Sequence, residues 1–230
     1  SIKGLNRIIA LLEKYELTAT FFTTANFANH HVDLVKDMSQ KHEVASHGYY
    51  HSSFDVKDLL ASREALEQVI EGPIHGYRMA RMMPVDDDEI QKAGYVYNAS
   101  LHPTFIPGRY NNLDKPRSWF MTDKVMHIPA AVTPVLRFPL FWLSFKNFPL
   151  PVIKFASKRV MNKDSYVNLY FHPWEFTDTT DKKKLGLPFY VSDNGDKMTG
   201  KLENYIQWSL KNGYKFCTYF DLYQMITGQT

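Results

Sequence analysis

Helix and strand patterns alternate along the first half of this chain, and this alternation constrains the fold more than any other feature. Residues 17–22, 43–45, 74–78 and 94–97 are short apolar, β-branched or aromatic runs that predict buried strands. Segments with apolar residues at helical spacing separate these runs, in units of roughly 25 residues. A connection that contains a helix joins parallel strands, so the pattern predicts an α/β fold with parallel strands and outer helices.

The rest of the chain adds further elements to this expectation. Helices are expected over 2–12, 31–41, 55–71, 85–90, 201–211 and 220–226. Further strands are expected at 166–171 and 215–218, and a polar loop is expected at 177–200. The whole chain of 230 residues suits one domain, because single α/β barrels reach this size.

Composition excludes some classes of function. The formal net charge is +3, which is too small and too scattered to favour binding to nucleic acid. Cys217 is the only cysteine, so no disulfide can form within the chain, and its apolar context predicts a buried core thiol. No leader peptide and no long apolar run are visible, so a cytoplasmic or membrane-peripheral location is expected.

Two histidines directly after a predicted strand are the strongest functional signal. His47 and His51 are four residues apart, and Ser46 and Gly48 leave room around them. Side chains at the carboxyl ends of barrel strands carry the chemistry of such folds. Two imidazoles can share a divalent cation such as zinc, but a catalytic zinc site usually needs a third protein ligand. His172, which follows the predicted strand 166–171, is a third candidate with the same layout.

The middle of the chain, about 103–163, departs from the strand–helix rhythm. It is rich in proline and large aromatic side chains, and prolines prevent one long helix there. One interpretation is an insertion that caps the barrel. The other is a hydrophobic edge at 134–159 that contacts a membrane surface or a lipid-linked substrate. In that case lipid phosphates would meet nearby cations, namely Arg137, Lys146, Lys154, Lys158 and Arg159.

Several motifs, in this order, resemble a known family. Ser46–Ser52 resembles the metal-binding motif of the polysaccharide deacetylases, carbohydrate esterase family four, and Leu11–Phe22 resembles their first helix and second strand. Gly76–Arg78 is similar to their arginine motif, and Gly94–Ser100 stands where they have an aspartate–serine motif. Phe171–Phe176 resembles their final histidine motif, in the form found in deacetylases of bacterial surface polysaccharides.

The resemblance implies a distorted (β/α) barrel of about seven parallel strands. It also implies a hydrolase that removes acetyl groups from sugars and so acts on carbon–nitrogen bonds other than peptide bonds. His47 and His51 would hold a divalent metal, with zinc expected, and His172 would be the general acid. Arg78 would orient a carboxylate base, and backbone N–H groups around Arg81 would help to stabilise the oxyanion. The substrate would be an N-acetylated sugar of a surface polysaccharide or of its lipid-linked precursor.

The sequence also departs from the family pattern. The family's first strand, which carries two carboxylates, is not found before the helix that opens this chain, and we expect it to lie upstream of Ser1. Asn98, a candidate substrate-binding residue together with Arg81 and Trp174, replaces the usual aspartate and would pair less strongly with Arg78. These departures keep an alternative open, a non-catalytic barrel that binds carbohydrate. A weaker third interpretation is a metal-dependent amide hydrolase for a small molecule.

Overall fold

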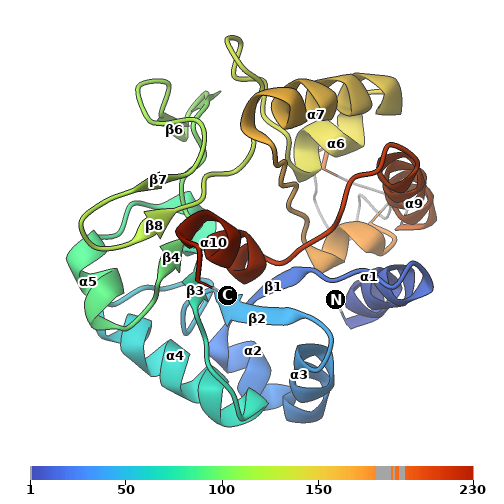
Figure 1. Ribbon diagram of the computed structural model, residues 1–230. Helices are drawn as coiled ribbons and strands as arrows, with labels where there is room; N and C mark the ends of the chain where they lie inside the picture. Colours follow the sequence, from blue (N-terminus) through green and yellow to red (C-terminus); the bar gives the residue numbers. More distant parts are fainter. Residues whose placement is uncertain (1, 180–187, 189, 192–194, 230) are drawn as a thin grey trace. The chain divides into compact units, whose positions relative to one another are not determined.

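The structure is a computed structural model that describes residues 2–179, 188, 190–191 and 195–229 (Figure 1). The chain divides into two compact units, each assembled from segments that are distant in sequence. Unit 1 consists of Ser1–Leu17, Thr104–Leu113 and Ala130–Phe216. Unit 2 consists of Thr18–Pro103, Asp114–Pro129 and Cys217–Thr230. The expected single barrel domain stays a prediction.

Unit 2 contains the sheet, which is mostly parallel as the sequence predicts. Its strands, in spatial order, are β1 (Thr20–Thr23), β2 (Glu43–Ser46), β3 (Gly76–Tyr77), β4 (Tyr97–Asn98), β8 (Met126–His127) and β7 (Phe120–Met121). The first five pair in parallel, and β1 and β2 are in register with Phe21 opposite Val44. β7 runs antiparallel to β8. The short β7–β8 connection allows only a hairpin. The expected α/β fold with a mostly parallel sheet is confirmed, and among the described residues five strands of this sheet, rather than about seven, pair in parallel.

The helices of unit 2 largely follow the predicted pattern. They are α2 (Ala25–His30), α3 (Val32–Ser39), α4 (Lys57–Ile70), α5 (Asp87–Lys92) and α10 (Tyr219–Thr227), with a 3₁₀ turn η1 (Ala80–Met82). α4 buries Leu59 and Leu66, as its apolar spacing indicates. The helix expected over 31–41 is α3. A separate helix that was not predicted, α2, precedes it, and the two are divided at His31, whose φ of −139° is not helical.

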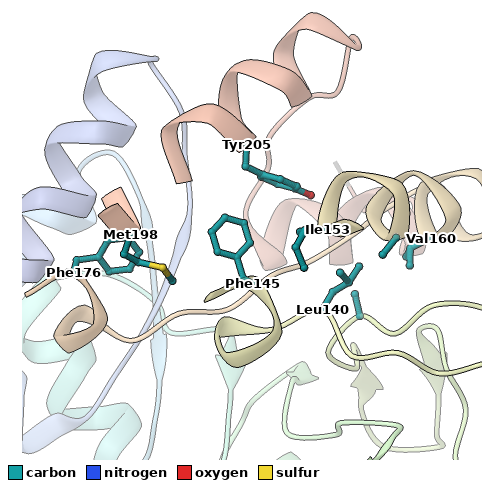
Figure 2. Packing of buried hydrophobic residues seen from close by; sticks show 9 residues of the cluster. Leu140, Phe145, Ile153, Val160, Phe176, Met198 and Tyr205 are labelled. Atoms are coloured by element: carbon teal, nitrogen blue, oxygen red, sulfur yellow. The ribbon is translucent and has the colours of Figure 1, made fainter. Parts of the chain in front are cut away.

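Unit 1 is mainly helical. It contains α1 (Ile2–Lys14), β5 (Phe105–Ile106), β6 (Tyr110–Asn111), α6 (Trp142–Asn147), α7 (Leu150–Asp164), the 3₁₀ turn η2 (Pro173–Phe176) and α9 (Gly195–Lys211). Figure 2 shows the core of this unit, where α6, α7 and α9 bring Phe145, Ile153 and Tyr205 together. α1 packs against η2 at Gly4, where an added Cβ would lie 1.8 Å from the Pro173 carbonyl oxygen. Only glycine fits this contact.

Four predictions about the second half of the chain were wrong. Tyr166–Phe171 and Lys215–Thr218 are not strands, because a strand forms only where a neighbouring backbone pairs with it, and neither segment joins a described sheet. Cys217 is consequently exposed, not buried in a strand. α9 begins at Gly195, so the end of the expected loop 177–200 is helical, and much of that loop lies outside the described residues.

The region expected as one insertion, about 103–163, is divided between the two units. Asp114–Pro129 belongs to unit 2, where β8 adds to the edge of the parallel sheet, and the remainder belongs to unit 1. Within the described ranges, no helix has the length and apolar character needed to cross a bilayer.

Candidate active site

His47 stands at the carboxyl end of β2, as the sequence predicts. Its backbone N–H donates to the Thr23 carbonyl at 2.9 Å, which continues the β1–β2 ladder by one residue. Gly48 follows with a φ of +81°, a conformation that other residues adopt at a cost. The turn brings His51 back toward His47, and the centroids of the two rings lie 5.4 Å apart.

One hydrogen bond fixes the proton on the His47 ring. Nδ1 lies 2.7 Å from the backbone carbonyl oxygen of Arg78. A carbonyl oxygen can only accept, so Nδ1 carries the hydrogen and the lone pair of the neutral ring is on Nε2. This is the tautomer in which a histidine binds a metal through Nε2, with the other nitrogen held by a backbone group. The donor chemistry of the His47–His51 pair therefore fits a divalent cation.

The residues that the structure describes do not supply the remainder of the expected ligand set. No three His, Cys, Asp or Glu side chains come together as a metal-binding group in the part of the chain that the structure describes. Glu43 is a partly buried carboxylate on the same strand as His47, but it begins β2, whereas His47 follows its end. Four strand residues span about 13 Å, which is too far for both to reach one cation.

Glu43 has a structural role instead. Its carboxylate accepts hydrogen bonds from the hydroxyls of Thr20 and Tyr97, each at 2.6 Å, and from the backbone N–H of Phe220 at 3.1 Å. Burial raises the pKa of Glu43, and these hydrogen bonds oppose the rise. This carboxylate thus ties β1 and β4 to the start of α10.

Arg78 follows β3 and is almost fully buried. Its Nε donates to the Ala99 carbonyl at 3.0 Å, its Nη2 donates to the Tyr219 hydroxyl at 2.7 Å, and the guanidinium lies 4.2 Å from the centroid of the Phe22 ring. Burial raises the pKa of Tyr219, and the charge of Arg78 opposes the rise. The sequence predicts a carboxylate partner for Arg78. Its observed partner is instead the phenol of Tyr219, which lies in the first turn of α10 and was not predicted.

The other two candidates in unit 2 lie close to these elements. Arg81 is exposed on η1 with a left-handed φ of +61°, and Met82 next to it has a φ of +56°. Non-glycine residues adopt this conformation rarely, and such strain is typical of functional loops. Asn98 is buried on β4, and its side-chain oxygen accepts hydrogen bonds from the N–H and hydroxyl of Ser100.

His172 lies in unit 1, and a carboxylate holds it. Its Nδ1 is 2.6 Å from Oε1 of Glu175, which also accepts the backbone N–H of His172 at 2.8 Å. Glu175 is 1% exposed, while the His172 side chain is 37% exposed. His172 is delivered by the start of η2, not by the predicted strand. Glu175 is a residue that the sequence analysis missed, although its i, i+3 spacing from His172 before a proline turn is a capping pattern.

Aromatic rings surround His172. The Trp174 ring stacks on it at 5.8 Å between centroids, and Trp142 from α6 meets it edge-on at 5.6 Å. Tyr170 completes the group with a further edge contact at 6.1 Å. Trp174 is therefore adjacent to the candidate acid, as expected, and Trp142 joins it without any signal in the sequence.

The structure thus defines two clusters. His47, His51, Arg78, Arg81 and Asn98 belong to unit 2, and His172 belongs to unit 1 together with Trp174. That the two clusters meet in one site stays a prediction.

Similar folds in solved structures define the class. PuuE allantoinase has a TM-score of 0.66 at 15% identity, with 95% of this chain and 70% of that chain covered. A probable polysaccharide deacetylase from Pseudomonas aeruginosa PAO1 has a TM-score of 0.60 at 15% identity and the same coverage. BA3943, a pseudoenzyme of carbohydrate esterase family four from Bacillus anthracis, has a TM-score of 0.53 at 16% identity, with 96% of this chain and 60% of that chain covered. At these identities the likenesses show the fold alone, an α/β fold with a mostly parallel sheet.

A family model also matches part of the sequence. The model of the polysaccharide deacetylases matches residues 3–82, a range that contains His47, His51 and Arg78. Over this range the chain resembles the polysaccharide deacetylases, as the motifs predict. A search of curated proteins finds no match to the chain.

Proposed function

We propose that this protein is a metal-dependent hydrolase that removes acetyl groups from N-acetylated sugars of a surface polysaccharide or of its lipid-linked precursor. The observation that carries the proposal is the His47–His51 pair. It stands at the end of a parallel strand, within the family match, and the hydrogen bond to Arg78 sets His47 in its metal-binding tautomer. Fold likeness alone would not distinguish a deacetylase from a protein that has lost activity.

Each residue of the site would have a distinct role. His47 and His51 would hold the cation, for which zinc suits two imidazoles and a carboxylate. The cation would supply Lewis acidity, which polarises a carbonyl group and lowers the pKa of a bound water. The backbone around Arg81 would donate N–H groups to the oxyanion, because its left-handed turn changes the direction of successive N–H groups.

His172 would protonate the sugar amine as it leaves. An imidazolium with Nδ1–H bound to the Glu175 carboxylate is held in a fixed orientation, and its Nε2–H is directed away from that carboxylate. Transfer of this proton to the departing nitrogen leaves a neutral imidazole and a free amine. Trp174 and Trp142 would offer apolar faces to the sugar ring beside the proton donor.

The lipid-linked substrate is supported by the aromatic segment 134–159. Val135 and Leu136 in this segment are almost fully exposed, which is unusual for aliphatic side chains. Contact with a membrane surface through this segment would bring a lipid-linked sugar to a membrane-peripheral enzyme.

Acetate release tests the proposal. The full-length protein, including any sequence that precedes Ser1, is loaded with zinc or cobalt and incubated with N-acetylglucosamine oligomers. We expect acetate release that stops when a chelator removes the metal and resumes when the metal is restored. A metal-loaded protein that releases no acetate from a panel of acetylated glycans would contradict the proposal.

A non-catalytic carbohydrate-binding protein is the second candidate. Two observations favour it, the phenol in contact with Arg78 and the uncharged Asn98 in place of an aspartate. The likeness in fold to a pseudoenzyme adds support. Calorimetry that shows glycan binding without acetate release would favour this candidate. An Asp-Asp or Asp-x-Glu pattern just upstream of Ser1 would favour the enzyme.

A further inference from the structure

A small hairpin in unit 1 precedes α6 in the chain. Val132 and Pro139 form an antiparallel bridge, and the Thr133 N–H donates to the Phe138 carbonyl at 2.9 Å. The Arg137 N–H donates back to the Thr133 carbonyl at 3.1 Å, which closes the turn. In Figure 1 the corresponding loop extends away from the helices of its unit. We call residues 132–139 the tip hairpin.

The base of the tip hairpin is anchored, while its end is apolar and exposed. Ala131 and Leu140, which flank it, are buried in the same core cluster as Ile153 of α7 (Figure 2 labels Leu140 and Ile153). At the other end, Val135 is 90% exposed and Leu136 is 86% exposed. An anchored stem therefore presents two aliphatic side chains to the surroundings.

The backbone at the end of the tip hairpin is strained. Val135 has a φ of +66° and Arg137 has a φ of +52°, and a β-branched residue is rarely found in this conformation. A chain that only had to turn here would favour glycine or asparagine. Strain of this kind, together with exposure of the same side chain, points to a contact that valine makes with something outside the chain.

The charge of the surrounding sequence indicates the chemistry of that contact. Residues 125–163 contain no aspartate or glutamate. They contain six cationic residues, Arg137, Lys146, Lys154, Lys158, Arg159 and Lys163. Arg137 directly follows the exposed aliphatic pair.

α7 repeats this combination on its outer face. Phe155 is 67% exposed and Val152 is 41% exposed, one turn apart. Lys158 and Arg159, also exposed, lie three and four residues after Phe155 and so share its side of the helix. An aromatic ring beside cations on one helix face is typical of helices that lie at a membrane surface.

An apolar groove lies at the base of the tip hairpin. Its volume is about 310 Å³, and Phe138 and Pro139 of the tip hairpin line it together with Phe141 and Phe148. The same segment lines this groove and contains the exposed pair Val135 and Leu136. An apolar ligand can therefore contact the protein at both places.

We propose that the tip hairpin and the outer face of α7 dock on an anionic lipid bilayer. Val135 and Leu136 enter the acyl region, while Arg137 and the cations of α7 contact lipid phosphates. The inference deepens the lipid-linked form of the proposed function and rests on it for the choice of substrate. A protein partner for this surface would also bury the aliphatic pair, but it would not require a long stretch without any acidic residue.

Vesicle flotation of the full-length protein tests the inference. We expect the wild type to float with vesicles of phosphatidylglycerol and phosphatidylcholine, and far less with phosphatidylcholine alone. In the double variant Val135→Asn, Leu136→Ser, the asparagine tolerates the positive φ at this position. The variant should lower the partition of the protein onto vesicles by about tenfold or more. The variant Lys158→Gln, Arg159→Gln should lower binding to the anionic vesicles only.

A matched control separates the tip hairpin from exposed apolar residues in general. Met225 on α10 is 69% exposed, and Met225→Ser should float as the wild type does. Equal flotation of the wild type and the Val135→Asn, Leu136→Ser variant would overturn the inference. So would a wild type that floats with no vesicle, or that only self-associates in solution.

The two proposals can fail separately. Acetate release from a soluble oligomer is measured on the same variants, and the hairpin variant should retain it because neither residue has a part in the proposed chemistry. Acetate release without flotation removes only the membrane inference. Flotation without acetate release from any glycan removes the proposed activity and leaves the membrane surface in place.

Discussion

His47 and His172 have the same kind of neighbourhood in the sequence but different hydrogen-bond partners in the structure. Each follows an apolar run, and each ring is held through Nδ1. For His47 the partner is a backbone carbonyl, that of Arg78 at 2.7 Å. For His172 it is the carboxylate of Glu175 at 2.6 Å. The difference parallels the two roles that we propose, a metal ligand for His47 and a general acid for His172.

The physical reason lies in charge. A neutral carbonyl accepts the Nδ1 hydrogen of His47 and so places the lone pair of the neutral ring on Nε2. The charged carboxylate of Glu175 orients the His172 ring through a stronger hydrogen bond. Two histidines that look equivalent in the sequence therefore have different partners, and we propose a different role for each.

The way each ring is positioned also differs. The β1–β2 ladder fixes the backbone of His47, and Gly48 sets the turn toward His51. His172 is held mainly by side chains, through the buried Glu175 and the ring of Trp174. We expect the His47 region to tolerate side-chain changes nearby better than the His172 region does.

Removal of a proposed ligand should have the largest effect. His47→Ala or His51→Ala should abolish retention of zinc, because a single remaining imidazole cannot hold it. Elemental analysis after dialysis measures the metal per chain. His30→Ala is the matched control, because the exposed His30 makes the same Nδ1 contact to a carbonyl, that of Asn26 at 2.7 Å. Unchanged zinc content in the His47 variant would show that the ligand assignment is wrong.

His172→Ala should leave zinc content unchanged and slow turnover by roughly two to four orders of magnitude. The reason is that the sugar amine is a poor leaving group unless it is protonated. An activated aryl acetate needs no such proton, so its hydrolysis by the variant should stay close to that of the wild type. If both substrates slow equally, His172 is not the general acid.

Glu175→Gln should slow turnover by about 10- to 100-fold, which is less than the loss of His172 itself. Glutamine fills the same space but lacks the negative charge that strengthens the hydrogen bond to Nδ1 of His172. Hydrolysis of the aryl acetate by this variant should stay close to that of the wild type. If Glu175 had only a structural role, hydrolysis of both substrates would slow. Glu203→Gln is the control, since that carboxylate bonds Lys14 and Tyr15 elsewhere in unit 1. A Glu175 variant with full turnover on sugars would show that the carboxylate does not assist His172.

The smallest effect concerns a histidine that serves packing. His102 is fully buried in unit 2, and burial, helped by the charge of Arg78, lowers its pKa from 6.5 to about 4. Between these values the unfolded chain binds a proton that the folded chain does not. The contribution of neutral His102 to the free energy of unfolding is therefore fully present above about pH 6.5 and is lost as the pH drops toward 4.

Chemical denaturation at two pH values checks this expectation. Wild-type unfolding free energy should fall by about 1 to 2 kcal/mol more than that of His102→Gln between about pH 7 and about pH 5. The comparison with the variant is needed because the raised pKa of Glu43 acts in the opposite sense and the lowered pKa of His75 in the same sense. Parallel pH profiles for the two proteins would rule out a buried neutral His102.

Much of unit 2 could be predicted from the sequence. The expected strand at 43–45 is β2, and His47 follows it directly. The expected helix over 55–71 is α4, because its apolar spacing buries one face. The approach of His51 to His47 also follows from local geometry, since four residues and a glycine turn leave few alternatives.

Other features depended on contacts that no local pattern records. The hydrogen bond from Arg78 to Tyr219 joins residues 141 positions apart. The segments 166–171 and 215–218 have strand-like composition, yet strand formation needs a neighbour to pair with. Trp142 approaches His172 only because α6 is packed into the core of unit 1.

Periodicity and turn chemistry act over a few residues, so the strand–helix order of unit 2, the family motifs and the histidines after apolar runs could be inferred from the sequence. The atom that each polar group contacts, including the phenol at Arg78 and the carboxylate at His172, followed from the three-dimensional packing. Those choices depend on how distant segments pack, and packing is set by the whole chain rather than by neighbours along it.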